Sequence, residues 1–302
     1  MCKLEGSQVA GVYGRDQTKA ADFAKRHGIS KVFKSVDELI NDPFVDIVYI
    51  ATPPDTHKEY AFAALTAGKH VYVEKPMGPN YTECVAMQQL ADAQNCKLFV
   101  AHYRRGLPYF AKVKSLLPMI GMVVSVKMEL NQTPKPEDYS PSLPWRLRAD
   151  QSGGGYFYDL APHGLDIIQF LVDDPIQDAN GFATNRAGLY EVADTVVASF
   201  KTKSGLLGTA NWNFATGADS TKDELTIIGT AGEISCAVFT FSPIRFISKG
   251  LVETFQTENP THIQAPFIQS ILHELRGNDK ALCTGNEALP TAWAMDRIMG
   301  KI

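Results

Sequence analysis

Apolar runs alternate with helical patterns over the first hundred residues of the chain. Strands are predicted where β-branched and aromatic residues cluster, at residues 7–14, 45–52, 70–73 and 97–102. Helices are predicted where a periodic segment ends at Gly28, or where a capping residue precedes a Glu by three positions, as at Ser35, Thr56 and Asn80. This alternation predicts a parallel, doubly wound sheet of the Rossmann type in an α/β domain.

The pattern changes after His102. A helix is expected around residues 109–117, and the proline-rich passage at 133–145 predicts a surface loop, because each proline fixes φ and removes a backbone donor. Residues 153–171 then turn into a helix, and short alternating runs follow with SG and AG turns between them. We therefore expect a Rossmann-like domain over residues 1–102 and an α+β domain with a large, mainly antiparallel sheet over residues 103–302.

The composition narrows the classes of function. The chain has 302 residues, of which 45% are hydrophobic, so it can bury two ordinary cores. A net charge of -4 gives no electrostatic footprint for nucleic acid or an anionic membrane, and no apolar run approaches the ~20 residues that span a bilayer. The N-terminus shows no signal peptide, and the 5 scattered cysteines form no CxxC pair. These features favour a cytoplasmic protein with reduced thiols and without a cysteine metal site.

Lys75 stands where an apolar strand stops, in the sequence HVYVEKPMG. In an open parallel sheet, the carboxyl ends of the strands form the ligand-binding rim. Two other strand ends, Gly14-Arg15 and Thr52-Pro53, are expected at the same rim. A lysine there can equally be a solvated surface charge, because rim loops carry many of them. Position alone leaves both interpretations open.

A second group of polar residues follows a run of glycines at residues 153–155. Asp159, His163 and Asp166 are spaced four and three residues apart, so a helix would place them on one face. A hydrogen bond donated by His163 to Asp159 would fix the His163 tautomer and raise its basicity, as in a general acid/base. The same residues could bind a metal, which the lack of further ligands disfavours, or Asp159 could simply cap a helix beside a partly buried His163.

These two segments together resemble a known family. GKHVYVEKP and WRLRADQSGGGYFYDLAPHGLDIIQFL are similar to sequences of the glucose-fructose oxidoreductase and inositol dehydrogenase (Gfo/Idh/MocA) family, and the likeness extends to DIVYIATPPDTHKEY, YRR and DELTIIGTAGEI. The resemblance implies an NAD(P)-dependent enzyme that transfers a hydride between nicotinamide and a hydroxyl or carbonyl carbon of a sugar, polyol or related compound. It also implies that the second domain binds substrate and forms a homodimer or homotetramer through its sheet.

The resemblance further implies roles for individual residues. Lys75 would approach the substrate hydroxyl and the nicotinamide, His163 would take the hydroxyl proton, and Asp159 would orient His163. The positions that resemble cofactor-binding residues are Gly14, Arg15, Thr52, Pro53, His57, Glu74 and Arg146. The positions suited to substrate binding are Tyr103, Arg104, Trp145 and Tyr158, although aromatic residues are more often simply packed.

One feature of the family is missing from this sequence. No GxGxxG motif occurs, and residues 7–14 match the second strand of the family, so we expect the first βα unit to be absent. The first strand, which belongs to the missing unit, is central in the strand order 3-2-1-4-5-6. Its two neighbours therefore pair directly, or the domain is poorly ordered, or the natural protein has residues upstream.

The missing motif leaves a second function open and bears on the choice of cofactor. An inactive or truncated relative would act as a binding or assembly protein instead of an enzyme. If a dinucleotide binds, Gly14-Arg15 replaces the acidic residue that would accept from the ribose 2′-hydroxyl, which favours NADP over NAD, although Asp16 is adjacent.

Overall fold

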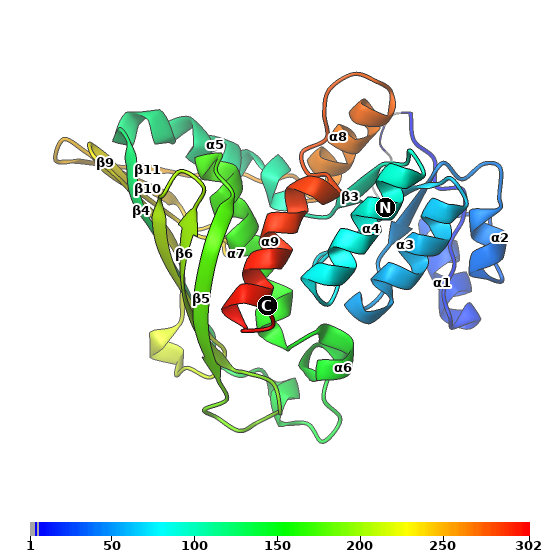
Figure 1. Cartoon of the computed structure of the whole chain (residues 1–302), viewed down its shortest axis with the longest axis horizontal. Helices are drawn as coiled ribbons and strands as arrows, with labels where there is room; N and C mark the ends of the chain where they lie inside the picture. Colours follow the sequence, from blue (N-terminus) through cyan, green and yellow to red (C-terminus); the bar gives the residue numbers. More distant parts are fainter. Residues whose placement is uncertain (1–3, 5) are drawn as a thin grey trace.

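The computed structural model describes residue 4 and residues 6–302, which form two sheets with helices around and between them (Figure 1). The helices are α1 (Gln17–His27), α2 (Val36–Ile40), α3 (His57–Thr66), α4 (Tyr81–Ala93), α5 (Pro108–Leu116), α6 (Ala149–Ser152), α7 (Tyr156–Val172), α8 (Ala265–Leu275) and α9 (Gly285–Ile298). The strands are β1 (Ile47–Ile50), β2 (His70–Val73), β3 (Leu98–Val100), β4 (Val123–Asn131), β5 (Ile176–Thr184), β6 (Thr195–Thr202), β7 (Leu207–Asn213), β8 (Lys222–Gly229), β9 (Gly232–Cys236), β10 (Ile244–Ser248) and β11 (Leu251–Phe255).

The smaller sheet contains three parallel strands in the order β1-β2-β3. Helix α3 connects β1 to β2, and α4 connects β2 to β3. Val71 and Val73 of the middle strand are fully buried, as expected where helices cover a parallel sheet. The Rossmann-type sheet predicted from the sequence is confirmed, and the carboxyl ends of its strands lie at one rim.

The strand predicted at residues 7–14 is wrong. Val12 makes only an isolated parallel bridge with Val32, and no described strand pairs with the second edge of β1. An extended segment becomes a strand only when a neighbour takes its backbone hydrogen bonds. Residues 7–14 and β1 therefore do not close up into a direct pair, which removes the first of the three possibilities for the missing central strand.

The predicted helix caps are largely correct. Gly28 adopts φ 66° after α1, and the side chains of Ser35 and Asn80 accept backbone N–H bonds at the starts of α2 and α4. Thr56 is the exception: its Oγ1 donates to Pro53 O at 2.9 Å, lies 2.7 Å from Thr52 Oγ1 in a hydroxyl–hydroxyl hydrogen bond, and makes no side-chain cap. A 3₁₀ turn precedes α3 and directs the hydroxyl backwards.

The larger sheet has eight strands in the order β11-β10-β9-β8-β4-β7-β6-β5, of which only β4 and β7 run parallel. The prediction of a large, mainly antiparallel sheet is therefore confirmed. Burial alternates along β6: Val196 is fully buried and Val197 is 51% exposed. The inner face of this sheet forms a core with α5, α7 and α9, of which α7 and α9 lie between it and the smaller sheet (Figure 1).

A second core surrounds the smaller sheet and includes residues from the end of the chain. Phe267 and Ile271 of α8, together with Cys283, pack with the side chains of β2 and β3. The chain thus returns to its first half after the large sheet is complete. The division at residue 102 stays a prediction. Within the described residues, no helix combines the length and apolarity needed to cross a bilayer.

The three glycines before α7 approach protein atoms. Gly153, Gly154 and Gly155 have φ values of 81°, 150° and 80°, which L side chains rarely adopt. A Cβ on Gly155 would lie 2.5 Å from Val192 Cγ2, and a Cβ on Gly154 would lie 2.7 Å from the Tyr158 ring. The glycine run therefore sets where α7 begins.

Candidate active site

One face of α7 meets three basic residues from the rim of the smaller sheet. Asp159, His163 and Asp166 share that face, as their spacing predicts. Lys75 follows β2, and the two arginines lie in the turn after β3. The contacts are Lys75 Nζ to Asp159 Oδ1 at 2.6 Å, Arg104 Nη1 to His163 Nδ1 at 2.6 Å, and Arg105 Nη2 to Asp166 Oδ1 at 2.7 Å. Segments far apart in the sequence are thereby joined at one place.

Asp159 is shared by two cations. Its Oδ1 and its backbone carbonyl accept from Lys75 Nζ, at 2.6 Å and 2.9 Å, and its Oδ2 accepts from Arg146 Nε at 2.9 Å. Burial alone would raise the pKa of Asp159, but the charges of Lys75 and Arg146 and their hydrogen bonds outweigh it and lower the pKa. Both carboxylate oxygens therefore accept from cations, and the expected hydrogen bond from a ring N–H of His163 to Asp159 is not formed.

His163 has an arginine in place of the expected carboxylate. Its Nδ1 faces Arg104 Nη1, and its ring lies edge-on to Tyr103 and Phe239, with centroids 5.8 Å away in each case. Only 6% of His163 is exposed. Burial and, after it, the charges of Arg104 and Lys75 hold the pKa of His163 well below its usual value. The imidazole is therefore neutral at pH 7.

Next along the chain from Arg104, Arg105 forms a buried bidentate ion pair with Asp166. Arg105 Nε donates to Asp166 Oδ2 at 3.0 Å, and Arg105 Nη1 donates to Leu282 O at 2.9 Å. The side chains of Asp166 and Arg105 are 1% and 8% exposed. His102 Nδ1 lies 3.7 Å from Asp166 Oδ2 and has no hydrogen-bond partner among the described residues. Burial lowers the pKa of His102 to about 4, so this ring is also neutral.

The turns after β1 and β2 are tied together by His57. This side chain is fully buried, with Nε2 2.8 Å from Thr52 O and Nδ1 3.0 Å from Pro76 O. The Lys75-Pro76 peptide bond is cis. His57 therefore shapes the rim from beneath and presents no ring nitrogen to a ligand.

Glu74 is fixed by two neighbours. Its Oε1 accepts from Tyr49 OH at 2.7 Å and from Gln264 Nε2 at 2.9 Å. Tyr49 stacks on Tyr72 with ring centroids 4.8 Å apart, although Tyr49 is half-exposed. This cluster lies across the paired strands β1 and β2 and holds the Glu74 carboxylate beside Lys75.

The remaining predicted residues fall into two groups. Trp145 stacks with Arg146, whose Cζ lies 4.5 Å from the indole centroid, and Tyr103 accepts from Arg104 Nη1 at 3.0 Å, so these two aromatic residues flank the site. Tyr158 is 2% exposed and donates to Asp296 at 3.1 Å, a packing contact with α9.

Gly14 and Arg15 lie at the turn before α1. Gln17 Nε2 donates to Gly14 O at 3.0 Å, and Arg15 is exposed. Asp16 is occupied as the N-cap of α1, where it accepts from Lys19 N at 3.1 Å. Arg15 is thus the charged side chain of this turn that remains available to a ligand.

Several residues that build the site were not predicted. His102, Arg105, Phe239 and Gln264 all contact its members. Arg105 and His102 stand in the AHYRR segment at the end of a predicted strand, so their position carried a signal. Phe239 and Gln264 come from loops of the second half, and no local pattern marks them.

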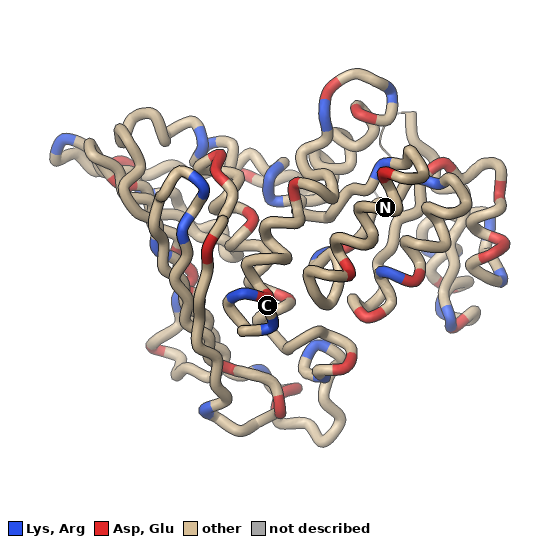
Figure 2. The backbone as a smooth tube through the Cα atoms, in the orientation of Figure 1, with Lys and Arg blue, Asp and Glu red and all other residues tan. Residues whose placement is uncertain are grey.

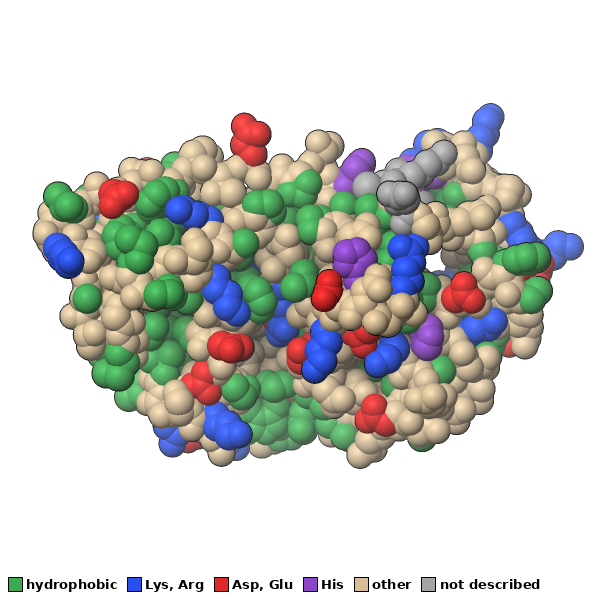
Figure 3. Space-filling view, turned by 90° about the horizontal axis from the view of Figure 1, so that it is seen from above, with side chains coloured by type: hydrophobic (Ala, Val, Ile, Leu, Met, Phe, Trp, Pro, Cys, Tyr) green, Lys and Arg blue, Asp and Glu red, His purple; other side chains and the backbone are tan. Residues whose placement is uncertain are grey.

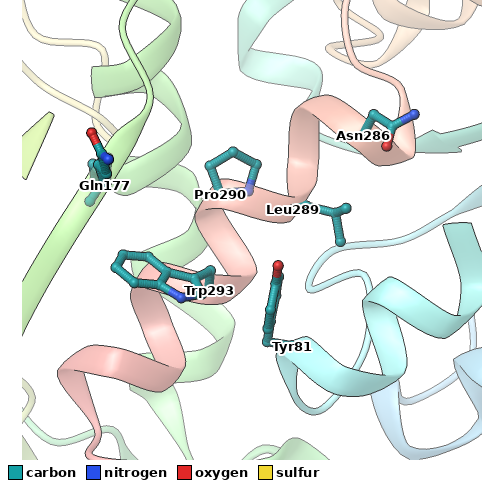
Figure 4. Close-up of a pocket in the computed structure, with 7 residues that line it drawn as sticks. Tyr81, Gln177, Asn286, Leu289, Pro290 and Trp293 are labelled. Atoms are coloured by element: carbon teal, nitrogen blue, oxygen red, sulfur yellow. The ribbon is translucent and has the colours of Figure 1, made fainter. Parts of the chain in front are cut away.

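Neither a metal site nor the hollow beside α9 coincides with the rim in the part of the chain that the structure describes. These residues contain no group of three or more His, Cys, Asp and Glu that could hold a metal. A hollow of about 320 Å³ lies between α4, β5 and α9, lined by Tyr81, Gln177, Pro290 and Trp293 among others (Figure 4). It includes none of the predicted site residues, so it is separate from the rim.

The rim fits the nicotinamide end of a dinucleotide. Lys75 carries three N–H donors and uses two of them on Asp159, so the third is available to a bound molecule. For the diphosphate end, the described residues supply no glycine-rich turn that leads into a helix beside β1. When bound, a nicotinamide supplies or accepts the hydride, and the residues above would orient the reacting carbon and oxygen.

Comparisons with known proteins agree with this geometry. A model described as the oxidoreductase family with an NAD-binding Rossmann fold (Gfo/Idh/MocA) matches residues 1–102, and a model of the Gfo/Idh/MocA C-terminal domain matches residues 110–235. The chain is 35% identical to Oxidoreductase P35 of Formosa agariphila over 302 residues, which cover 99% of this chain and 92% of that protein.

Two other relatives extend the comparison. The 1,5-anhydro-D-fructose reductase of Ensifer adhaerens is 25% identical over 298 residues, which cover 95% of this chain and 86% of that protein. A levoglucosan dehydrogenase solved in complex with NADH and levoglucosan superposes with a TM-score of 0.85 at 22% identity, over 97% of this chain and 87% of that one, which shows a common fold. The predicted family and the NAD-binding oxidoreductase class are confirmed.

The neutral, buried His102 makes stability depend on pH. Its folded-state pKa of about 4 lies below the ordinary 6.5, so between these values the unfolded chain binds more protons and folding stability falls as the pH drops. When the pH is lowered from 6 to 4.5, we expect the free energy of unfolding to fall less in His102→Gln than in the wild type. The two slopes should differ by about 1.4 kcal/mol per pH unit. Urea unfolding at both pH values measures this, with the exposed His262→Gln as the matched control. Equal slopes for wild type and His102→Gln contradict the assignment.

Proposed function

We propose, from the premise that this chain belongs to the Gfo/Idh/MocA family of NAD-binding oxidoreductases, that it transfers a hydride to or from the carbon that bears a hydroxyl or carbonyl group of a sugar, a polyol or a related compound. The observation that carries the proposal is the meeting of Lys75, Asp159 and His163 at the strand ends of a Rossmann-type sheet. These three groups stand where a hydride transfer needs hydrogen-bond donors and a proton exchanger beside the reacting oxygen.

The relatives support the substrate class. Two of them carry names with a sugar derivative, anhydrofructose and levoglucosan, and the levoglucosan dehydrogenase was solved with its sugar bound. In this chain, Trp145 beside Arg146 offers an aromatic face next to a cation, the usual surface for a sugar ring with its hydroxyl groups. Lys and Arg are interspersed with Asp and Glu along both halves of the chain (Figure 2). This mixture of charges favours a neutral small molecule over a polyanion as the ligand.

Nucleotide binding separates the enzyme from the inactive relative that acts as a binding or assembly protein. We propose NADP as the preferred cofactor, supported by Arg15, which is exposed beside the turn, while Asp16 is engaged in capping α1. Titration of the protein with NADH and NADPH, followed by nicotinamide fluorescence, is expected to show binding, and Arg15→Ala is expected to weaken NADPH about 10-fold without changing NADH. If neither NADH nor NADPH binds at millimolar concentration, the proposal that this chain is an enzyme is wrong.

Turnover tests the site itself. Lys75→Ala and His163→Ala are each expected to lower turnover by about 100-fold, the scale of a lost proton-transfer or oxygen-binding group. The assay follows nicotinamide absorbance with a panel of aldoses, polyols and anhydrosugars. Arg148→Ala removes an exposed arginine whose ion-pair partner among the described residues is Asp150, at 3.7 Å; it is the control and should retain the wild-type rate. Wild-type turnover in both active-site variants would refute the assignment of the site.

We also propose that the outer face of the large sheet packs against a second copy of the chain, as a homodimer or homotetramer. Phe182 and Val197 are 88% and 51% exposed and pair across β5 and β6, and Leu207 is 60% exposed on the same face. Hydrophobic side chains reach the surface at the end of the molecule that this sheet forms (Figure 3). Exposed apolar residues gathered on one sheet face are typical of an interface.

Light scattering tests the oligomer. The wild type is expected to be a dimer or tetramer, and Val197→Asp is expected to dissociate it, because a charge in the centre of an apolar interface is costly to desolvate. Val9→Asp, at a 42% exposed position of the first half, is the matched control and should not change the mass. A monomeric wild type excludes the proposal.

A cytoplasmic location completes the proposed function. It is supported by the cysteines: Cys84, Cys96, Cys236 and Cys283 are all free and buried, as in proteins of reducing compartments. Extraction of the protein in the soluble fraction of a gently lysed cell, separate from secreted and membrane fractions, measures this, and enrichment in the secreted fraction would count against it.

A further inference from the structure

The hydrogen bond between Arg104 and His163 fixes which nitrogen of the imidazole carries the proton. A guanidinium group has N–H donors and no acceptor. Arg104 Nη1 lies 2.6 Å from His163 Nδ1, so Nδ1 must use its lone pair to accept. In a neutral imidazole the remaining proton is then on Nε2. No described residue makes a hydrogen bond to Nε2, which leaves this N–H for a bound molecule.

We propose that Arg104 is a positioning residue that holds His163 in the Nε2–H tautomer, so that His163 binds the substrate oxygen as a hydrogen-bond donor while Lys75 exchanges the proton. The proposal rests on the proposed function, since it concerns the oxygen of that substrate. It differs from the role that the sequence predicts, in which His163 takes the hydroxyl proton with help from Asp159.

Arg104 is held in place from three sides. Its Nε donates to Val238 O at 2.9 Å, its Nη1 also donates to Tyr103 OH at 3.0 Å, and its Cζ lies 4.8 Å from the centroid of Phe239. The side chain is 5% exposed, and no carboxylate of the described residues lies within ion-pair distance of it. Burial of a guanidinium without a carboxylate partner costs free energy. The contacts of Arg104 with His163 and with the Val238 carbonyl offset that cost.

The loop that contacts Arg104 is itself fixed by one carboxylate. Asp223 of β8 accepts from the backbone N–H groups of Val238, Phe239 and Thr240, at 2.9, 2.8 and 2.7 Å. This places both the Val238 carbonyl and the Phe239 ring against Arg104. The orientation of the guanidinium, and with it the His163 tautomer, is therefore set by the folded second half.

Lys75 is the group left to exchange the proton. Asp159 is directed to Lys75 and Arg146 and makes no hydrogen bond to His163, whose Nδ1 contacts Arg104. In the reducing direction, a hydride from the nicotinamide cofactor adds to the carbonyl carbon, and the C=O π pair moves onto the oxygen. That oxygen takes a proton from Lys75 Nζ: an N–H bond breaks, an O–H bond forms and the amine becomes neutral. The Nε2–H bond of His163 stays intact, and the oxidising direction reverses each step.

The tautomer can be observed without any turnover. We expect two-bond ¹H–¹⁵N spectra of ¹⁵N-histidine-labelled full-length protein to show Nε2 protonated and Nδ1 unprotonated for His163 at pH 7. The signals are assigned by their loss in His163→Asn. Arg104→Met, which cannot donate, is expected to lose this pattern, and Arg148→Met, the matched control, is expected to keep it. Should Arg104→Met fail to fold, the wild-type spectrum decides alone.

A proton on Nδ1 of His163, or an imidazolium at pH 7, overturns the proposal. So does an unchanged tautomer in folded Arg104→Met. These outcomes are independent of the proposed function, because a protein that binds no nucleotide still reports its tautomer.

A kinetic comparison tests the division of roles. The amide N–H of a glutamine can replace the Nε2–H donor but cannot exchange a proton as a base. His163→Gln is therefore expected to stay within about 10-fold of the wild-type turnover, while His163→Ala and Lys75→Ala lose about 100-fold. Equal 100-fold losses in His163→Gln and His163→Ala would show that His163 exchanges the proton and would overturn the proposal.

Discussion

The ion pair between Arg105 and Asp166 is the contact on which the arrangement of the site depends. It is bidentate and almost fully buried, and Arg105 also donates to Leu282 O, so one side chain joins the turn after β3, helix α7 and the segment before α9. Removing two charges from water costs several kcal/mol for each ion, which only good geometry and further hydrogen bonds offset. Such a pair adds little net stability, but its two parallel hydrogen bonds favour one orientation of α7 against the smaller sheet. That orientation then determines where the residues one and two turns earlier along the helix must lie.

The charges on the two sides of this contact explain why His163 is not paired with Asp159. Three cations of the rim face two carboxylates and one imidazole on α7. Lys75 and Arg105 take the carboxylates, and Arg146 adds a second cation to Asp159. Arg104 is left with a neutral acceptor, His163 Nδ1, and burial, followed by the charge of Arg104, lowers the pKa of His163 and keeps the imidazole uncharged. The spacing on one helix thus places the groups together, whereas the opposing cations decide which of them interact.

The contrast between spacing along a helix and the choice of partner also explains which features of the structure could be predicted from the sequence. Regular patterns were sufficient for the parallel sheet, the large antiparallel sheet and the shared face of Asp159, His163 and Asp166, because these depend on periods of two and 3.6 residues. Partner choice was not predictable, since Arg104 and Phe239 come from remote segments. Residues 7–14 have the composition of a strand, but among the described residues their pairing is limited to one isolated bridge, between Val12 and Val32. Thr56 has the spacing of a cap, but a preceding 3₁₀ turn redirects its hydroxyl.

Helix α7 is also held at its other end. This second attachment helps to position the helix face that bears Asp159, His163 and Asp166. Asp296 of α9 accepts from Tyr158 OH at 3.1 Å and from the backbone N–H of Tyr81 at 2.7 Å, so a single buried carboxylate joins α9, α7 and α4. Lys301 Nζ donates to Gly153 O at 2.9 Å and closes the glycine turn. Asp296 contacts the first turn of α7 and Arg105 contacts the third, so the helix is attached at two points along its length. These two attachments position the face of α7 on which Asp159 meets Lys75.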